Sequence, residues 1–69
     1  MERGRIAWYS MNLGHGFILP EAGGPNVFVR RENIVVAGDE ERTLENNDMV
    51  CYEVTQSAEG PEAKNVSKV

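Results

Sequence analysis

Hydrophobic and polar residues of this chain alternate over short segments, and clusters of glycine and proline separate these segments before any helical repeat develops. Alternation with a period of two places one row of side chains on each face of a strand. The breaks at Pro20 and at residues 23–26 are typical of turns. The pattern predicts an all-β protein with five short strands over residues 5–10, 15–19, 27–30, 49–55 and 63–67.

The size of the chain limits how these strands can be arranged. Its 69 residues form a single domain, residues 1–69, near the lower size limit for a fold held by an apolar core alone. The single Cys51 cannot form an intrachain disulfide, and it cannot build a zinc site with the lone His15. Five antiparallel strands with a long acidic connection from residue 31 to 47 fit a small closed or nearly closed barrel, which has no exposed strand edge. The strand count alone also fits an SH3-like barrel.

Charge is distributed unevenly along the chain. The formal net charge is −4, yet residues 1–31 carry four arginines against two glutamates. Residues 32–62 carry nine acidic side chains against one arginine. Four of the five aromatic residues lie in the first, non-acidic part, so basic and aromatic side chains share a segment. This distribution indicates a local surface that attracts an anionic partner despite the acidic total.

The second and third predicted strands place aromatic rings on an unusual face. If Ile18, Val27 and Val29 point into the barrel, alternation turns Phe17 and Phe28 outward. His15 and Arg30 lie on the same outer face as these rings. The opposite arrangement would bury Arg30, which costs several kcal/mol without a buried counter-charge. We therefore expect an exposed aromatic and basic patch, suited to stacking against flat ligands such as nucleic-acid bases.

A regular strand would place Trp8 on the same face as Ile6, because the two residues are two positions apart. A bend or β-bulge between the two would place Ile6 inside and Trp8 outside. A tryptophan in the core remains the alternative. Tyr9 and Tyr52 are expected in the core, each with a hydrogen-bonded hydroxyl.

Several classes of protein are not indicated. One His, one Cys and three Ser stand at no spacing that pairs a nucleophile with a base, so we expect no catalysis, cofactor, metal site or small-molecule substrate. The Gly14-His15-Gly16 element precedes a strand rather than a helix and lacks a Lys-Ser/Thr pair, so it does not indicate a phosphate-binding loop.

The longest aliphatic run is too short for a bilayer span, and no apolar segment follows the first residues. We expect a cytoplasmic monomer.

Five segments spread over nearly the whole chain, 4–9, 14–18, 27–31, 42–45 and 60–66, match the motifs of a known family. The first resembles Gly-Lys-Val-Lys-Trp-Phe, the second Lys-Gly-Phe/Tyr-Gly-Phe-Ile and the third Val-Phe-Val-His-Phe. The last two resemble Thr-Leu-x-x-Gly and Gly-Pro-x-Ala-x-Asn-Val. The chain thus resembles the cold-shock domain, a five-stranded antiparallel OB-fold barrel that binds single-stranded RNA and DNA.

The resemblance implies a binding surface formed by six residues: Trp8, His15, Phe17, Phe28, Arg30 and Arg31. Trp8, Phe17 and Phe28 would stack bases, and His15 would stack or form a hydrogen bond. Arg30 and Arg31 would contact phosphates or bases. The sequence also departs from the family pattern, because usual lysines or aromatic residues are replaced at Ala7, Leu13, His15, Arg30, Arg31 and Glu41. Stacking area is lost and two guanidiniums are gained.

These features predict a protein that binds single-stranded RNA or DNA and acts as an RNA chaperone or as a regulator of transcription or translation. The alternative is a divergent barrel that binds a partner protein. Met11, Leu13 and the acidic loop 39–48 would form that interface.

Overall fold

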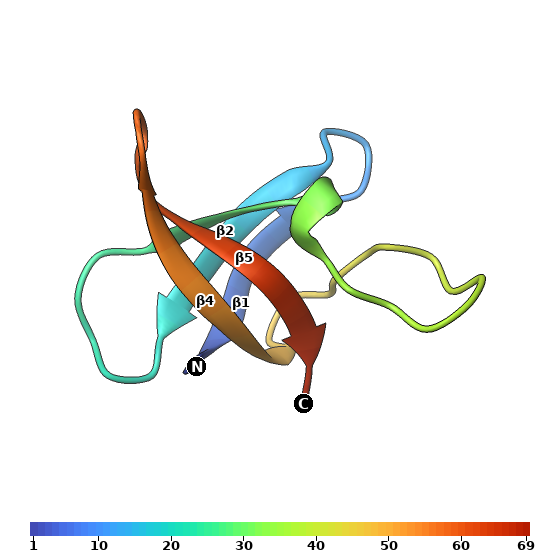
Figure 1. Cartoon of the computed structure of the whole chain (residues 1–69), viewed down its shortest axis with the longest axis horizontal. Coiled ribbons are helices and arrows are strands. Elements are labelled where there is room, and N and C mark those ends of the chain that lie inside the picture. The colour runs from blue at the N-terminus through green and yellow to red at the C-terminus, as the bar shows by residue number, and fades with distance from the viewer.

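The computed structural model describes all 69 residues as a five-stranded closed barrel (Figure 1). The order of the strands around the barrel is β1-β2-β3-β5-β4. A single turn of 3-10 helix, η1 (Arg31–Asn33), follows β3 directly. None of the helical structure is long and apolar enough to cross a membrane. The strands are β1 (Glu2–Ser10), β2 (His15–Pro20), β3 (Val27–Arg30), β4 (Met49–Ser57) and β5 (Gly60–Lys68).

The predicted barrel and its five strands are confirmed, with one correction to the expected antiparallel pairing. β3 and β5 run parallel where Phe28 lies beside Glu62, while the other four pairs of neighbours are antiparallel. The reason is geometric, because directions cannot alternate around a closed ring with an odd number of strands. Four strands also extend beyond their predicted limits: β1 begins at Glu2, β2 continues to Pro20, β4 continues to Ser57, and β5 spans Gly60–Lys68.

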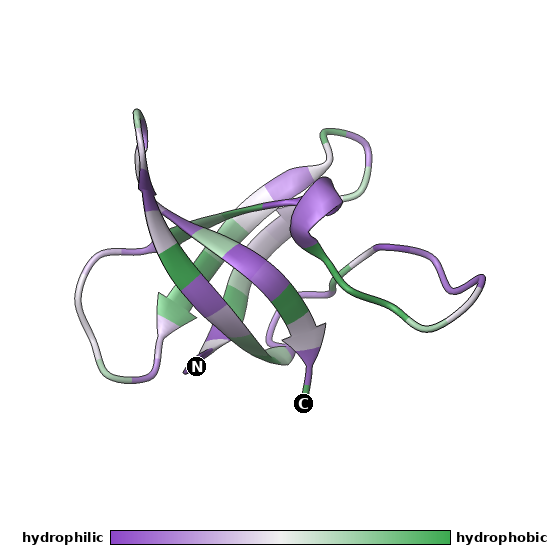
Figure 2. Ribbon diagram, in the orientation of Figure 1, coloured by the Kyte–Doolittle hydropathy of each residue, from purple (hydrophilic) through white to green (hydrophobic).

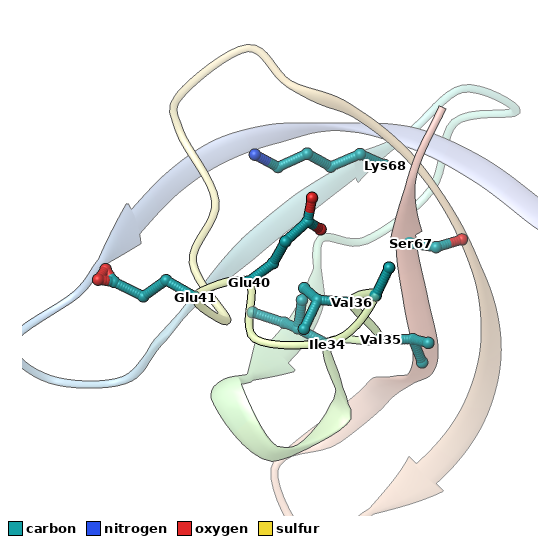
Figure 3. Close-up of a pocket in the computed structure, with 8 residues that line it drawn as sticks. Ile34, Val35, Val36, Glu40, Glu41, Ser67 and Lys68 are labelled. Atoms are coloured by element: carbon teal, nitrogen blue, oxygen red, sulfur yellow. The ribbon is translucent and has the colours of Figure 1, made fainter.

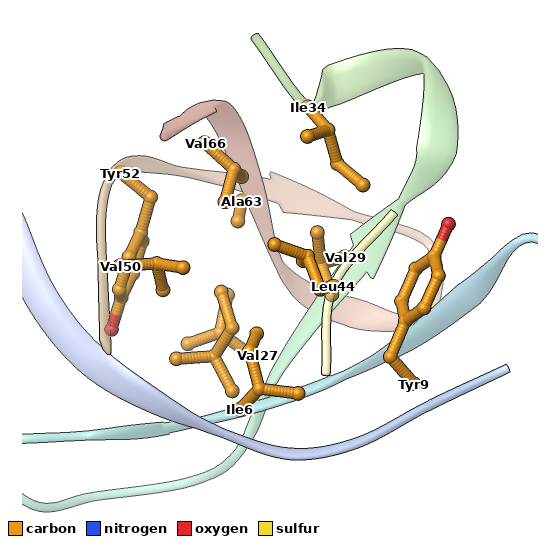
Figure 4. Close-up of a cluster of buried hydrophobic side chains, with 11 residues drawn as sticks. Ile6, Tyr9, Val27, Val29, Ile34, Leu44, Val50, Tyr52, Ala63 and Val66 are labelled. Carbon is orange, nitrogen blue, oxygen red and sulfur yellow. The ribbon is translucent and has the colours of Figure 1, made fainter. Parts of the chain in front are cut away.

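The core consists of the inward row of each strand together with two residues from the long loop (Figure 4). Bands of hydrophobic and hydrophilic residues follow one another along β4 and β5 (Figure 2), as period-two alternation requires. Each fully buried aliphatic or aromatic side chain stabilises the fold by about 1.5–3 kcal/mol relative to exposure. The buried cluster is Ile6, Tyr9, Ile18, Val27, Val29, Ile34, Leu44, Val50, Tyr52, Ala63 and Val66.

Both tyrosines are buried as predicted, but their hydroxyls differ from expectation. Tyr9 and Tyr52 lie at opposite ends of the core in Figure 4, and neither hydroxyl has a hydrogen-bond partner. Burial raises the pKa of Tyr52, and the negative charge of Glu2 raises it further. Sequence alternation places a ring inside but carries no information about which group its hydroxyl reaches.

The acidic connection between β3 and β4 is attached to the barrel at both ends. At its start, the backbone N–H of Val35 donates to the carbonyl of Val66 at 2.7 Å. At its end, the N–H of Asn47 donates to Ile6 O at 2.7 Å, and Ile6 N–H donates to Asp48 O at 2.8 Å. Ile34 and Leu44 are buried and connect the loop to the core.

A groove of about 500 Å³ lies between this loop and the end of β5 (Figure 3). It has an aliphatic floor and a charged rim, and it shares no residue with the aromatic and basic patch predicted on β1–β3. Its lining consists of Ile34, Val35, Val36, Ala37, Glu40, Glu41, Ser67 and Lys68.

Candidate nucleic-acid interface

The aromatic residues of β2 and β3 lie on the outer face of the barrel, as the alternation predicts. Phe17 and Phe28 are cross-strand partners, and the Phe17 side chain is 39 % exposed. The aliphatic residues of the opposite parity, Ile18, Val27 and Val29, are buried. The outward position of the two rings therefore follows directly from the inward position of the β-branched residues.

A β-bulge brings Trp8 to the same face. Ile6 pairs with Ile18, but Trp8 pairs with Phe17, so the register shifts by one residue between Ile6 and Trp8. The extra residue reverses the parity of the strand, and Trp8 is 42 % exposed while Ile6 and Tyr9 are both buried. The predicted bulge is confirmed, and the alternative of a tryptophan in the core is excluded.

Gly16 allows β1 and β2 to come close together at this bulge. It pairs with Tyr9, and an added Cβ would overlap the carbonyl oxygen of Trp8. Because that atom belongs to the backbone, no side-chain rotation could relieve the overlap. The glycine thus fixes the local path of the strand that carries Trp8.

Four rings form one contiguous cluster across β1, β2 and β3, which we call the aromatic platform: Trp8, His15, Phe17 and Phe28. The Phe17 and Phe28 centroids are 5.5 Å apart with the rings inclined at 62°. His15 connects Phe28 to Trp8, with centroid distances of 5.3 Å and 6.0 Å respectively. These edge-to-face and tilted contacts stabilise the rings against one another while part of each ring system remains open to solvent.

Arg30 lies over one ring of the platform and pairs with two carboxylates. Its guanidinium carbon lies over the Phe28 ring, 5.0 Å from the centroid. Its Nε donates to the carboxylate Oε2 of Glu62 at 3.2 Å, and its Nη2 is 3.7 Å from Glu59 Oε1. Glu62 is 6 % exposed, so the counter-charge lies beneath the surface.

Arg31 points in another direction from the five other predicted residues. Its Nη2 donates to the carbonyl of Met11, and its backbone N–H donates to Gly14 O at 2.9 Å. The guanidinium therefore braces the turn between β1 and β2 instead of joining the rings. That turn carries two exposed apolar residues, Met11 and Leu13, which belong to the interface of the alternative hypothesis, a barrel that binds a partner protein.

Two cations that sequence reasoning did not select lie on the same outer face. Arg3 and Arg5 are exposed on β1, and neither forms an ion pair. Arg5 is the cross-strand partner of Leu19, which follows Phe17 on the outer row of β2. The alternation of β1 could have identified both residues. Gly4, between them, and Ile6, after Arg5, point inward, so Arg3 and Arg5 point outward.

Comparison with known proteins agrees with this architecture. The model of the 'Cold-shock' DNA-binding domain matches residues 2–69. A probable cold shock protein A from Mycolicibacterium smegmatis is 42 % identical over 69 residues, covering all of both chains. Cold shock protein CspB from Bacillus caldolyticus is 39 % identical over 69 residues, also covering all of both chains.

A solved structure provides an independent comparison of the fold. The Drosophila Unr CSD456 structure superposes with a TM-score of 0.76 at 20 % identity, covering 99 % of this chain and 26 % of that one. At this identity the likeness concerns the fold alone. Together with the match over residues 2–69, it supports the five-stranded barrel and its strand order. The chain belongs to the cold-shock domain family.

Proposed function

We propose that this protein binds single-stranded RNA or DNA on the outer face of β1–β3, by stacking bases on the aromatic platform. The observation that carries the proposal is the exposure of Trp8 and Phe17 beside Phe28 and His15 on one sheet face. Exposed rings stay partly hydrated until a flat ligand covers them, and each stacked base contributes about 1–3 kcal/mol. Bases in a duplex are already stacked on their neighbours, so the platform favours unpaired strands.

The cations near the platform differ in what they can contact. Arg3 and Arg5 are exposed and unpaired, and they provide a positive end toward which the phosphate backbone is attracted. Neither β2 nor β3 contains an acidic residue, so a nucleic-acid strand that crosses them meets no negative side chain from these two β-strands. The acidic residues of the chain are concentrated after residue 31.

Binding of this kind needs no catalytic step. A protein that binds only the unpaired form of an RNA shifts its equilibrium away from base-paired structure by mass action. Such an RNA chaperone would influence transcription or translation through the structure of the transcript. We assign the protein to this role as a cytoplasmic monomer, with Trp8, His15, Phe17, Phe28 and Arg30 as the contact surface and Arg31 supporting the adjoining turn.

A fluorescence titration tests the proposal, since Trp8 is the only tryptophan. Stacking of a base on its indole is expected to quench its emission when oligothymidine or oligouridine heptamers are added. A duplex of the same length is expected to give little quenching. The proposal fails if single strands up to high micromolar concentration leave the emission unchanged.

A further inference from the structure

The side chain of Arg30 is fixed by a network that includes a buried carboxylate. Oε2 of Glu62 accepts a hydrogen bond from Arg30 Nε at 3.2 Å and from the amide of Asn33 at 3.4 Å. Lys64 Nζ lies 3.7 Å from the same oxygen. The ion pair to Glu59 is added at the surface, with 3.7 Å between Nη2 and Oε1. These contacts hold the guanidinium over Phe28.

This network removes most of the attraction that Arg30 would otherwise exert on a phosphate. Two cations, Arg30 and Lys64, face two carboxylates, Glu59 and Glu62, so the cluster has no net formal charge. The Glu59 side chain is exposed and would repel a phosphate that approached the guanidinium. A neutral ligand with hydrogen-bond acceptors does not meet this repulsion.

The carboxylates also determine which donors of Arg30 remain available. Glu62 accepts from Nε, and Glu59 Oε1 lies 3.7 Å from Nη2. Nη1 has no carboxylate partner, and the Nη1 and Nη2 end of a guanidinium carries two parallel N–H groups that form a fork. The side chain is 43 % exposed, so this fork is accessible from solvent.

Guanine matches such a fork. Its O6 and N7 are adjacent acceptors and bind an arginine through two parallel hydrogen bonds. On that edge adenine presents a donor beside N7, cytosine presents a donor at N4, and thymine or uracil presents a single acceptor at O4. An unpaired cytosine also exposes N3 and O2 as adjacent acceptors, so a single-cytosine heptamer is the competitor from which the test must distinguish guanine. A guanine in the plane of the guanidinium also stays on the outer side of Phe28, where the platform holds the strand.

We propose that Arg30 recognises a guanine base in single-stranded nucleic acid, and that Glu62 acts as a positioning residue for Arg30. The proposal rests on the function proposed above and adds a base preference at one place on the platform. It assigns Arg30 to reading a base edge and leaves attraction of the phosphate backbone to the unpaired Arg3 and Arg5.

The test compares heptamers that differ at one base. Trp8 quenching is measured for an all-thymidine heptamer and for seven single-guanine versions, one at each position. At one position guanine is expected to tighten binding about tenfold, within the range for one bidentate contact. Inosine at that position, which retains O6 and N7, is expected to bind as guanine does, and cytosine there is expected to bind less tightly. 7-Deazaguanine, which lacks N7, is expected to lose most of the gain.

Variants locate the preference at Arg30. Arg30→Lys keeps the charge and removes the fork, and it is expected to bring the guanine-to-thymine affinity ratio to within about twofold of one. Glu62→Gln keeps an acceptor for Nε and is expected to retain more of the ratio than Glu62→Ala. Arg42→Lys, a matched change at an exposed arginine of the acidic loop, is expected to leave the ratio as in the parent chain.

The outcomes separate the two proposals. Three results would overturn the guanine assignment: equal affinity for all eight heptamers, equal binding of guanine and 7-deazaguanine, or an unchanged guanine-to-thymine ratio in Arg30→Lys. In each case, quenching by the thymidine heptamer would still support the proposed function. Absence of quenching by every heptamer contradicts both. Thermal melting of each variant shows that the fold is retained, so a lost ratio reports on recognition.

Discussion

Trp8 lies opposite Phe17 in the β1–β2 ladder, although Ile6, two residues earlier, lies opposite Ile18. Two residue steps on β1, from Ile6 to Trp8, lie opposite one step on β2, from Ile18 to Phe17, and this bulge moves the indole from the core to the platform. The position of a single inserted residue therefore determines whether the barrel has a tryptophan on its binding face. Gly16 makes the arrangement possible, because its missing side chain leaves room for the Trp8 carbonyl.

Gly16→Ala tests this dependence. The added methyl would overlap a backbone oxygen, so the strands must separate, and we expect a loss of at least about 2 kcal/mol in the free energy of unfolding. Gly24→Ala is the control, because its site is open and only its positive φ of 96° opposes a side chain, at a cost of about 1–2 kcal/mol. Urea unfolding measures both. A Gly16→Ala protein as stable as the parent chain would contradict the close approach.

Phe17→Ala separates binding from stability. The ring is partly exposed, so its removal is expected to cost little folding free energy, but it removes stacking worth about 1–3 kcal/mol per base. Affinity for a thymidine heptamer should fall by about fivefold to 150-fold, measured by Trp8 quenching. Val54→Ala removes a similarly exposed apolar side chain from β4, outside the platform, and should leave affinity within twofold. Equal effects of the two changes would argue against the platform.

The unpaired cation at the start of the platform should dominate the salt dependence. Arg5→Gln is expected to reduce the slope of log K against log salt by about 0.7, the value for one phosphate contact on a single strand. Lys68→Gln is the matched control, because Lys68 Nζ is paired with Asp48 Oδ2 at 3.5 Å. Titrations at several salt concentrations give both slopes. An identical slope for Arg5→Gln and the parent chain would show that the backbone takes another path.

Tyr52 makes the stability of the barrel sensitive to alkaline pH. Because burial, and then Glu2, raise the pKa of its hydroxyl above 10.0, the unfolded chain releases the proton first as pH rises. Folding stability from this group is complete below pH 10 and declines as pH rises toward the folded-state pKa.

Tyr52→Phe should remove that decline. At neutral pH the variant should be as stable as the parent chain or up to about 1 kcal/mol more stable, because the deleted hydroxyl has no partner. Chemical denaturation at several pH values gives the difference between the two proteins, in which contributions from other groups cancel. A difference that stays constant above pH 10 would contradict the raised pKa.

Local sequence patterns predicted what depends on neighbouring residues. Alternation placed Phe17 and Phe28 opposite the β-branched residues, and the cost of burying Arg30 beside them selected the outward face. A regular strand would have placed Ile6 and Trp8 on one face, and this conflict predicted the bulge between them. Five short strands with a long connection between the third and the fourth indicated a small closed or nearly closed barrel, although strand count alone also fitted an SH3-like barrel.

Patterns could not predict contacts that depend on distant parts of the chain. Arg30 and Glu62 are 32 residues apart and meet across the parallel pair of β3 and β5, which local alternation does not specify. The turn of Arg31 toward the Met11 carbonyl depends on η1, which begins at that residue. The sequence therefore identified the aromatic surface, whereas the contacts of Arg30 and Arg31 could be assigned only from the three-dimensional structure.

A map of amide chemical-shift changes on adding an oligothymidine heptamer tests the central claim most directly. Binding on the platform predicts changes concentrated in residues 3–19 and 27–31, with few among the residues that line the groove, 34–37, 40, 41, 67 and 68. Changes centred on that groove, with the amides of Phe17 and Phe28 unaffected, would contradict it.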